Sequence, residues 1–156
     1  MPERVDWFQW FLEFFDEVKD RFAVVLGAAG CGELWLQGEL FLHGDRCDDM
    51  SLFTNHPGVL KKGLADLFAV ARARSPMVGE IKIVSAEGTV MDSAIDKDVQ
   101  KLRNRCIQGS EAYMVLVIPE SKKQTALGRR LEKLQYSDQS DERDYGDFKV
   151  RIWRID

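Results

Sequence analysis

The sequence predicts an α/β fold built on one mixed sheet, because stretches with helical spacing alternate with short runs typical of strands. Residues 5–22 repeat apolar side chains at helical intervals, and residues 78–84 are rich in β-branched side chains. Residues 112–118 form a continuous apolar run, the pattern of a strand buried on both faces. A length of 156 residues fits one domain with a sizeable core.

The predicted first helix, residues 5–22, carries an unusual number of aromatic side chains. Its main apolar stripe keeps helical spacing, but Trp7, Trp10 and Phe14 widen the stripe beyond one face. We expect the helix to cover the domain and to leave some of these three side chains for a second copy of the chain or a protein partner. A membrane-surface role is not expected, because the polar face is mainly acidic.

A second helix is predicted at residues 32–42 and a short strand at residues 50–54. Residues 59–74 admit two interpretations. The apolar run that follows Asp66 fits a strand, whereas apolar residues at helical intervals across the segment fit an amphipathic helix. Only the first interpretation places Asp66 in the sheet.

The strand at residues 78–84 carries charge into the sheet. Side chains alternate along a strand, so Glu80 and Lys82 project to one face, where an acid at Asp66 on a neighbouring strand would meet them. Two carboxylates suit a hard cation such as Mg²⁺, with the backbone carbonyl of Ile81 as a further ligand. Such a cation polarises a phosphate and activates water, while Lys82 positions that water or offsets developing charge. The pattern predicts metal-assisted phosphodiester cleavage.

Asp66, followed by Glu80-Ile-Lys82 between apolar residues, resembles the core motif of the PD-(D/E)XK nuclease superfamily, with Ala65 in place of the eponymous proline. The resemblance spans residues 32–118. It implies a restriction-endonuclease-like α-β-β-β-α-β core, with an extra N-terminal helix and an added C-terminal helix and strand. It also implies that Asp66, Glu80 and the carbonyl of Ile81 bind Mg²⁺ or Mn²⁺, and that Lys82 serves the attacking water.

The same resemblance implies a catalytic glutamate on the helix before the sheet. Glu33 and Glu39 both lie on this helix, and six residues of helix separate them by about 240° of rotation, so both cannot point into one site. We favour Glu39, because it lies beside inward-facing leucines. The acid at Glu33 is explained by the dipole at the start of the helix.

A third helix is predicted at residues 93–107 and resembles the helix that follows the Glu-x-Lys strand in the superfamily. We expect Lys101 and Arg105 on this helix to contact substrate phosphates. Lys61 and Lys62 precede the Asp66 strand and are expected to do the same if Asp66 holds a metal.

The C-terminal part is predicted to add a helix at residues 121–135, an acidic loop at residues 136–147 and a last strand at residues 148–155 on the sheet edge. The expected single domain, residues 1–156, thus has three parts. These are the first helix with its linker (1–31), the core (32–118) and the C-terminal helix and edge strand (119–156).

Composition indicates the class of protein and its compartment. The net charge of −4 argues against a general nucleic-acid binder but does not exclude a nuclease, because acids at the site contribute to it. Cys31, Cys47 and Cys106 are odd in number and widely spaced, which fits a reduced cytoplasmic setting. Neither a secretory signal nor an apolar stretch of the ~20 residues that span a membrane is visible.

These features predict a Mg²⁺-dependent endonuclease whose substrate is nucleic acid, with DNA favoured. The alternative is a non-catalytic nuclease-fold subunit that joins a larger assembly through its aromatic helix. Two acids and a lysine in one buried cluster favour catalysis, because burying charge without a metal is unfavourable. The acidic composition favours the alternative.

Overall fold

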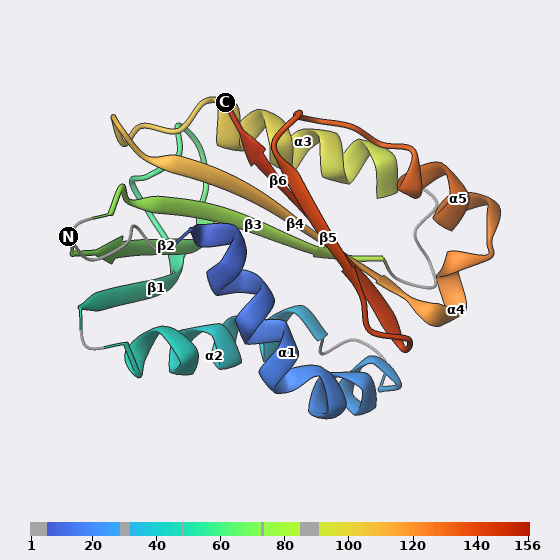
Figure 1. Cartoon of the computed structure of the whole chain (residues 1–156). Coiled ribbons are helices and arrows are strands. Elements are labelled where there is room, and N and C mark those ends of the chain that lie inside the picture. The colour runs from blue at the N-terminus through green and yellow to red at the C-terminus, as the bar shows by residue number, and fades with distance from the viewer. Residues whose placement is uncertain (1–5, 29–31, 48, 73, 85–90) are drawn as a thin grey trace.

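The structure, a computed structural model, describes residues 6–28, 32–47, 49–72, 74–84 and 91–156. One sheet of six strands runs in the order β1-β2-β3-β4-β6-β5. Strands β3 and β4 are parallel and every other neighbouring pair is antiparallel, so the sheet is mixed, as expected. Figure 1 shows α1 and α2 on one side of this sheet and α3 on the other.

The helices and strands follow the predicted order from α1 to β4, with boundaries that differ by a few residues, and depart from it between β4 and β6. In chain order they are α1 (Trp7–Leu26), α2 (Gly32–Asp45), β1 (Met50–His56), β2 (Ala65–Ala71), β3 (Met77–Ile83), α3 (Met91–Arg103), β4 (Glu111–Pro119), α4 (Glu120–Lys123), α5 (Ala126–Glu132), β5 (Ser140–Asp144) and β6 (Phe148–Ile155).

The central strand β4 divides the interior into two cores. Tyr113, Val115 and Val117 pack with α1 and α2, whereas the residues between them pack with α3. Every residue from 112 to 118 is buried, which confirms the prediction made from the apolar run. The neighbouring β3 has the same two faces, because Ile81 joins the first core and Val78 the second.

The aromatic side chains of α1 are buried in the first core. Trp7, Trp10 and Phe14 are only 1%, 3% and 0% exposed. The rings of Trp10 and Phe14 contact His43 of α2, and Trp7 Nε1 donates a hydrogen bond to the carbonyl of Ser75 at 3.2 Å. The expectation that some of these three side chains remain for a partner is therefore wrong, because α2 and the segment before β3 cover the additional faces of the helix.

The two interpretations of residues 59–74 are resolved in favour of the strand. β2 pairs with β1 on one side and with β3 on the other. Val59 and Leu60, which suggested helical spacing, lie in the β1–β2 loop and are buried for a separate reason. The amide of Cys106, just after α3, donates to the carbonyl of Val59 at 2.7 Å, so the loop is held against the end of α3.

The predicted helix at residues 121–135 is two short helices, α4 and α5. Thr125 interrupts the helix: its hydroxyl accepts from the amide of Gly128 at 3.0 Å and donates to the carbonyl of Lys122 at 2.6 Å. A side chain of this kind competes with the helical hydrogen bonds of the backbone and caps the second helix.

The predicted acidic loop contains the edge strand β5, so the prediction that β6 forms the sheet edge is wrong. All five residues of β5 are exposed and polar, and such a strand lacks the apolar alternation that marks a strand in sequence. Glu142 of β5 holds it to β6, with its carboxylate 3.5 Å from Arg151 Nε and 3.6 Å from Lys149 Nζ. Charges of this kind protect an edge from pairing with other chains.

Among the described residues, no helix is both long and apolar enough to cross a membrane. Cys47 and Cys106 are free thiols, and Cys31 lies outside the described residues.

Candidate metal and phosphate site

The candidate site forms where β2 and β3 stop pairing. Their paired positions end at Leu67 and Gly79, and the same register continued would set Asp66 opposite Glu80. At that point the amide of Ile81 donates instead to Asp66 Oδ2 at 2.9 Å. A side-chain carboxylate therefore replaces a backbone carbonyl at the end of the ladder, and β3 has a free edge beyond it.

A second carboxylate continues along this edge. The amide of Ile83 donates to Glu33 Oε1 at 3.2 Å, so acids from β2 and α2 accept from alternate amides of β3. The first turn of α2 packs closely on the end of β3: a Cβ at Gly32 would lie 2.9 Å from Ile83 Cδ1, the end of a side chain.

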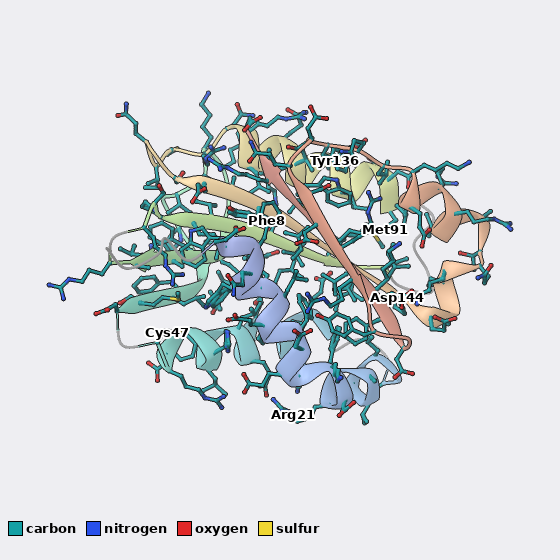
Figure 2. All side chains as sticks on the ribbon, viewed as in Figure 1. Phe8, Arg21, Cys47, Met91, Tyr136 and Asp144 are labelled. Carbon is teal, nitrogen blue, oxygen red and sulfur yellow. The ribbon has the colours of Figure 1, made fainter. Side chains whose placement is uncertain are left out.

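The acid of α2 that lies at the site is Glu33 and not Glu39, which was the preferred candidate. Glu39 Oε2 lies 3.1 Å from Nη2 of Arg21 on α1. Figure 2 shows Arg21 at the edge of the molecule away from the sheet. Because α2 approaches β3 with its first turn and not with its middle, Glu33 faces β3. The helical rotation between the two glutamates then turns Glu39 toward α1.

Glu80 is the buried acid of the site, with 2% of its surface exposed. Burial, a hydrogen bond shared with Asp66 and the negative charges of Asp66 and Asp98 raise the pKa of Glu80 to about 9. Its Oε1 is buried without a hydrogen-bond partner among the described residues, and Lys101 Nζ lies 3.9 Å away. At neutral pH the Asp66–Glu80 pair therefore holds a proton, which a bound cation would displace.

Asp98 on α3 is a site residue that the sequence analysis does not select. It is 7% exposed, and its carboxylate lies 3.3 Å from Lys82 Nζ and 3.5 Å from Lys101 Nζ. The signal was present in the sequence, since Ile95 and Leu102 are three and four residues away and both are fully buried. Helical spacing thus places Asp98 on the inner face of α3.

Lys82 lies on the α3 side of β3, as strand alternation predicts for Glu80 and Lys82 together. Burial alone would lower the pKa of Lys82, but Asp98, Glu33 and Asp66 outweigh burial and raise it above the ordinary value. Lys82 is therefore a permanent cation at neutral pH, able to donate hydrogen bonds and offset negative charge but not to accept a proton.

The three lysines predicted to bind phosphate lie in two places. Lys101 lies at the site with 43% of its side chain exposed. Lys61 and Lys62 are exposed in the β1–β2 loop, and their contact with phosphate stays a prediction.

The prediction for Arg105 is corrected. Its Nε and Nη2 donate to the carbonyl of Ser110 at 3.2 and 3.1 Å, and its Nη1 donates to the carbonyl of Leu102 at 3.0 Å. All three nitrogens are occupied in joining the end of α3 to the start of β4. These bonds make the guanidinium a structural tie, which argues against the predicted phosphate contact.

The donors at the site fit one hard cation. Among the described residues no three His, Cys, Asp or Glu side chains are grouped as a metal cage. Mg²⁺ commonly takes only one or two carboxylates and completes its shell with water and substrate phosphate. Asp66 and the unpartnered Oε1 of Glu80 match that pattern. The carbonyl of Ile81 leaves the same edge of β3 as its amide, which faces Asp66.

The cluster therefore combines the carboxyl groups of Asp66, Glu80 and Asp98 with Lys82 and the half-exposed Lys101 at the end of a strand pair. Comparisons with protein-family models, curated proteins and solved structures found no match for this chain. Its function is accordingly argued from the residues themselves.

Proposed function

We propose that this chain is a Mg²⁺-dependent nuclease of the PD-(D/E)XK type. The observation that carries the proposal is the convergence of Asp66, Glu80 and Lys82 where β2 and β3 separate, with Glu80 buried and its Oε1 lacking a hydrogen-bond partner among the described residues. The element order α2-β1-β2-β3-α3-β4 supports the finer assignment to a restriction-endonuclease-like core, because it follows the α-β-β-β-α-β order of that fold.

Each residue has a distinct task in this proposal. Asp66 and Glu80 hold the cation, which polarises the phosphate and lowers the pKa of a water molecule. Lys82, kept charged by Asp98, orients the attacking water through a hydrogen bond and offsets negative charge at the phosphate. Lys101, exposed beside Glu80, binds a phosphate of the substrate.

The competing function is a non-catalytic nuclease-fold subunit. It is favoured by the ion pairs of Asp98 with Lys82 and Lys101, which are complete without a metal. Those pairs leave the contact between Asp66 and Glu80 unexplained, since a buried carboxyl group beside a second, half-buried one is unfavourable unless a proton or cation lies between them. We therefore prefer the nuclease.

A digestion assay tests the proposal. Labelled single-stranded DNA, duplex DNA and RNA are incubated with the protein in Mg²⁺, in Mn²⁺ and in EDTA. We expect metal-dependent cleavage by the wild type, its loss in Asp66→Asn, and its retention in Asp20→Asn, which changes an exposed acid on α1 in the same way. Failure to cut every substrate in both metals would leave the non-catalytic subunit as the better account.

A further inference from the structure

Strands β1 and β2 carry a partly exposed aromatic cluster beside the candidate site, in which Phe53 is exposed and His56 and Phe68 are half-buried. The ring centroids of Phe53 and Phe68 are 6.1 Å apart, and His56 lies 5.2 Å from Phe68 and 5.0 Å from Phe53. His56 and Phe68 are nearly parallel, with an interplanar angle of 18°. Phe53 is 42% exposed. We call these three rings the aromatic platform.

The backbone places the three rings on the face of the sheet that is turned away from α2. Residues 67, 69 and 71 of β2 pack in the first core, so alternation sends Phe68 to the opposite face. Asn55 has a positive φ of 49° and its side chain donates to Gln37 of α2 at 3.1 Å. This local reversal turns the next residue, His56, onto the outer face, where its ring stacks on Phe68.

The platform is continuous with the candidate site. Asp66 and Phe68 are two residues apart on one strand, so they share a face and are separated by about 7 Å of strand rise. That distance corresponds to about two nucleotides of a stacked strand, at 3.4 Å each. A base resting on Phe68 would place a nearby phosphate of the same strand at Asp66.

On this side of the sheet α3 packs on β3, β4 and β6, and Phe68 packs against the second core, so Phe53 is the exposed ring of the platform. Charge near the platform is suited to a polyanion. The stretch 51–72 contains Lys61, Lys62 and Arg72, all exposed, against the single acid Asp66, although the whole chain has a net charge of −4. Positive charge beside exposed stacked rings is the combination that binds single-stranded nucleic acid.

We propose that the aromatic platform stacks unpaired bases, so that the site acts on a single-stranded segment of nucleic acid. This inference rests on the proposed nuclease function for its biological purpose but not for its physical basis. Bases in a duplex are stacked on each other and hide their faces, whereas every unpaired base offers a π-face to Phe53, His56 or Phe68.

Fluorescence anisotropy with labelled oligonucleotides tests the proposal in Ca²⁺, which occupies oxygen sites without matching the geometry of Mg²⁺. The full chain is titrated against single-stranded DNA, single-stranded RNA and duplex DNA. Phe53→Leu keeps an apolar side chain but removes the ring, Phe53→Trp keeps a ring, and Phe41→Leu changes a phenylalanine that is 45% exposed on α2. Melting curves establish that each variant is folded.

We expect Phe53→Leu to weaken single-strand binding about tenfold, the loss of one base stack, while duplex binding stays unchanged. Phe53→Trp and Phe41→Leu should bind as the wild type does. Equal binding by Phe53→Leu and Phe41→Leu would overturn the proposal. Loss of a dimer in Phe53→Leu, seen by light scattering with oligonucleotide binding intact, would also overturn it and assign the rings to self-association.

The two proposals fail separately. A wild type that binds single strands through Phe53 but cuts nothing in Mg²⁺ or Mn²⁺ supports the platform and removes the nuclease. A wild type that cuts nucleic acid while Phe53→Leu binds and cuts equally well removes the platform and keeps the nuclease.

Discussion

Glu80 has an environment that is unfavourable for a charged carboxylate, because it is buried beside Asp66 and its Oε1 has no hydrogen-bond partner in the described part of the chain. Its neighbours Lys82 and Lys101 reduce the cost only in part: Lys101 Nζ is 3.9 Å away, and Lys82 is engaged by Asp98. A buried carboxyl group in this environment is more stable when it holds a proton or binds a cation.

The first prediction concerns stability and pH without metal. The pKa of Glu80 is raised from 4.5 to about 9, so the folded state holds this proton more tightly than the unfolded state does. That contribution to stability is fully present below about pH 4.5 and is lost as the pH rises toward 9. Glu80→Gln remains uncharged and lacks this decline. In EDTA its Tm should exceed that of the wild type increasingly with pH, by about 2–4 °C for each kcal/mol.

Thermal unfolding monitored by circular dichroism from pH 5 to pH 9 measures this difference. Parallel pH profiles for the wild type and Glu80→Gln would contradict the assignment of the proton to Glu80.

The second prediction separates the two glutamates of α2. Glu33 accepts from the amide of Ile83 and adds negative charge beside Lys82, whereas Glu39 pairs with Arg21. Glu33→Gln should reduce the cleavage rate about tenfold or more, the effect of removing a group that orients a metal site. Glu39→Gln should leave the rate unchanged. Initial cleavage rates at saturating Mg²⁺ test this pair, and the reverse order of effects would restore Glu39 as the site residue.

The third prediction separates the two basic residues of α3 and the segment after it. Lys101→Ala should weaken nucleic-acid binding and reduce its salt slope by about one phosphate contact. Arg105→Ala should leave the slope unchanged but lower the free energy of unfolding by about 1–3 kcal/mol, because it removes charged hydrogen bonds to buried carbonyls. Binding measured at several salt concentrations, together with urea unfolding, distinguishes the two. A reduced slope in Arg105→Ala would show that its guanidinium reaches the substrate.

At the scale of elements, α1 is a covering helix whose aromatic side chains fill the core on several sides. Phe15 is fully buried and its ring contacts Phe14, Phe22, Tyr145 and Phe148. Asp6 caps the start of the helix, and its side chain accepts from the amide of Phe8 at 2.9 Å. This packing joins α1 to α2 on one side and to β6 on the other.

The fourth prediction tests that role. Phe15→Ala should lower the free energy of unfolding by about 3–5 kcal/mol, because it leaves a cavity among aromatic rings. Val24→Ala on the same helix should change it by less than about 0.5 kcal/mol, since Val24 is 77% exposed. Urea denaturation provides the comparison. Similar losses in both variants would mean that α1 is not part of the cooperative core.

The elements that sequence could predict were those whose pattern comes from burial. The apolar run of β4 and the charge alternation of β3 were sufficient to place Glu80 and Lys82 on one face. β5 could not be found, because its side chains are all polar and only its pairing with β6 makes it a strand. The break at Thr125 depends on one hydroxyl, a local competition that apolar spacing does not report.

The positions of Asp66 and of the helix glutamate could be predicted only in part, because they depend on contacts that residue spacing does not report. Whether Asp66 lies in a strand or a helix was ambiguous in the sequence. Val59 and Leu60 are buried because the β1–β2 loop that contains them is held against the end of α3, and their apolar side chains resemble the start of a helical stripe. The choice between Glu33 and Glu39 depends on how α2 approaches β3: its first turn brings Glu33 to the amide of Ile83, while Glu39 faces Arg21 of α1. Packing between elements decides such questions, and a single sequence does not contain it.

At the scale of the whole molecule, the sheet carries two surfaces that meet at Asp66. One is the pair of carboxylates at the open edge of β3, and the other is the aromatic platform across β1 and β2. The first core and α1 cover the opposite face. In the proposed function, a substrate strand would lie on this side of β1 and β2, with the proposed metal position at its end.

The measurement that tests the account most directly is a calorimetric titration of Mn²⁺ into the wild type, Glu80→Gln and Lys82→Ala, with cleavage assayed on the same samples. We predict one site in the wild type, an affinity at least about tenfold weaker in Glu80→Gln, and a nearly unchanged affinity in Lys82→Ala, while both variants lose cleavage. Mn²⁺ bound as tightly by Glu80→Gln as by the wild type would contradict the central claim that Asp66 and Glu80 hold the metal.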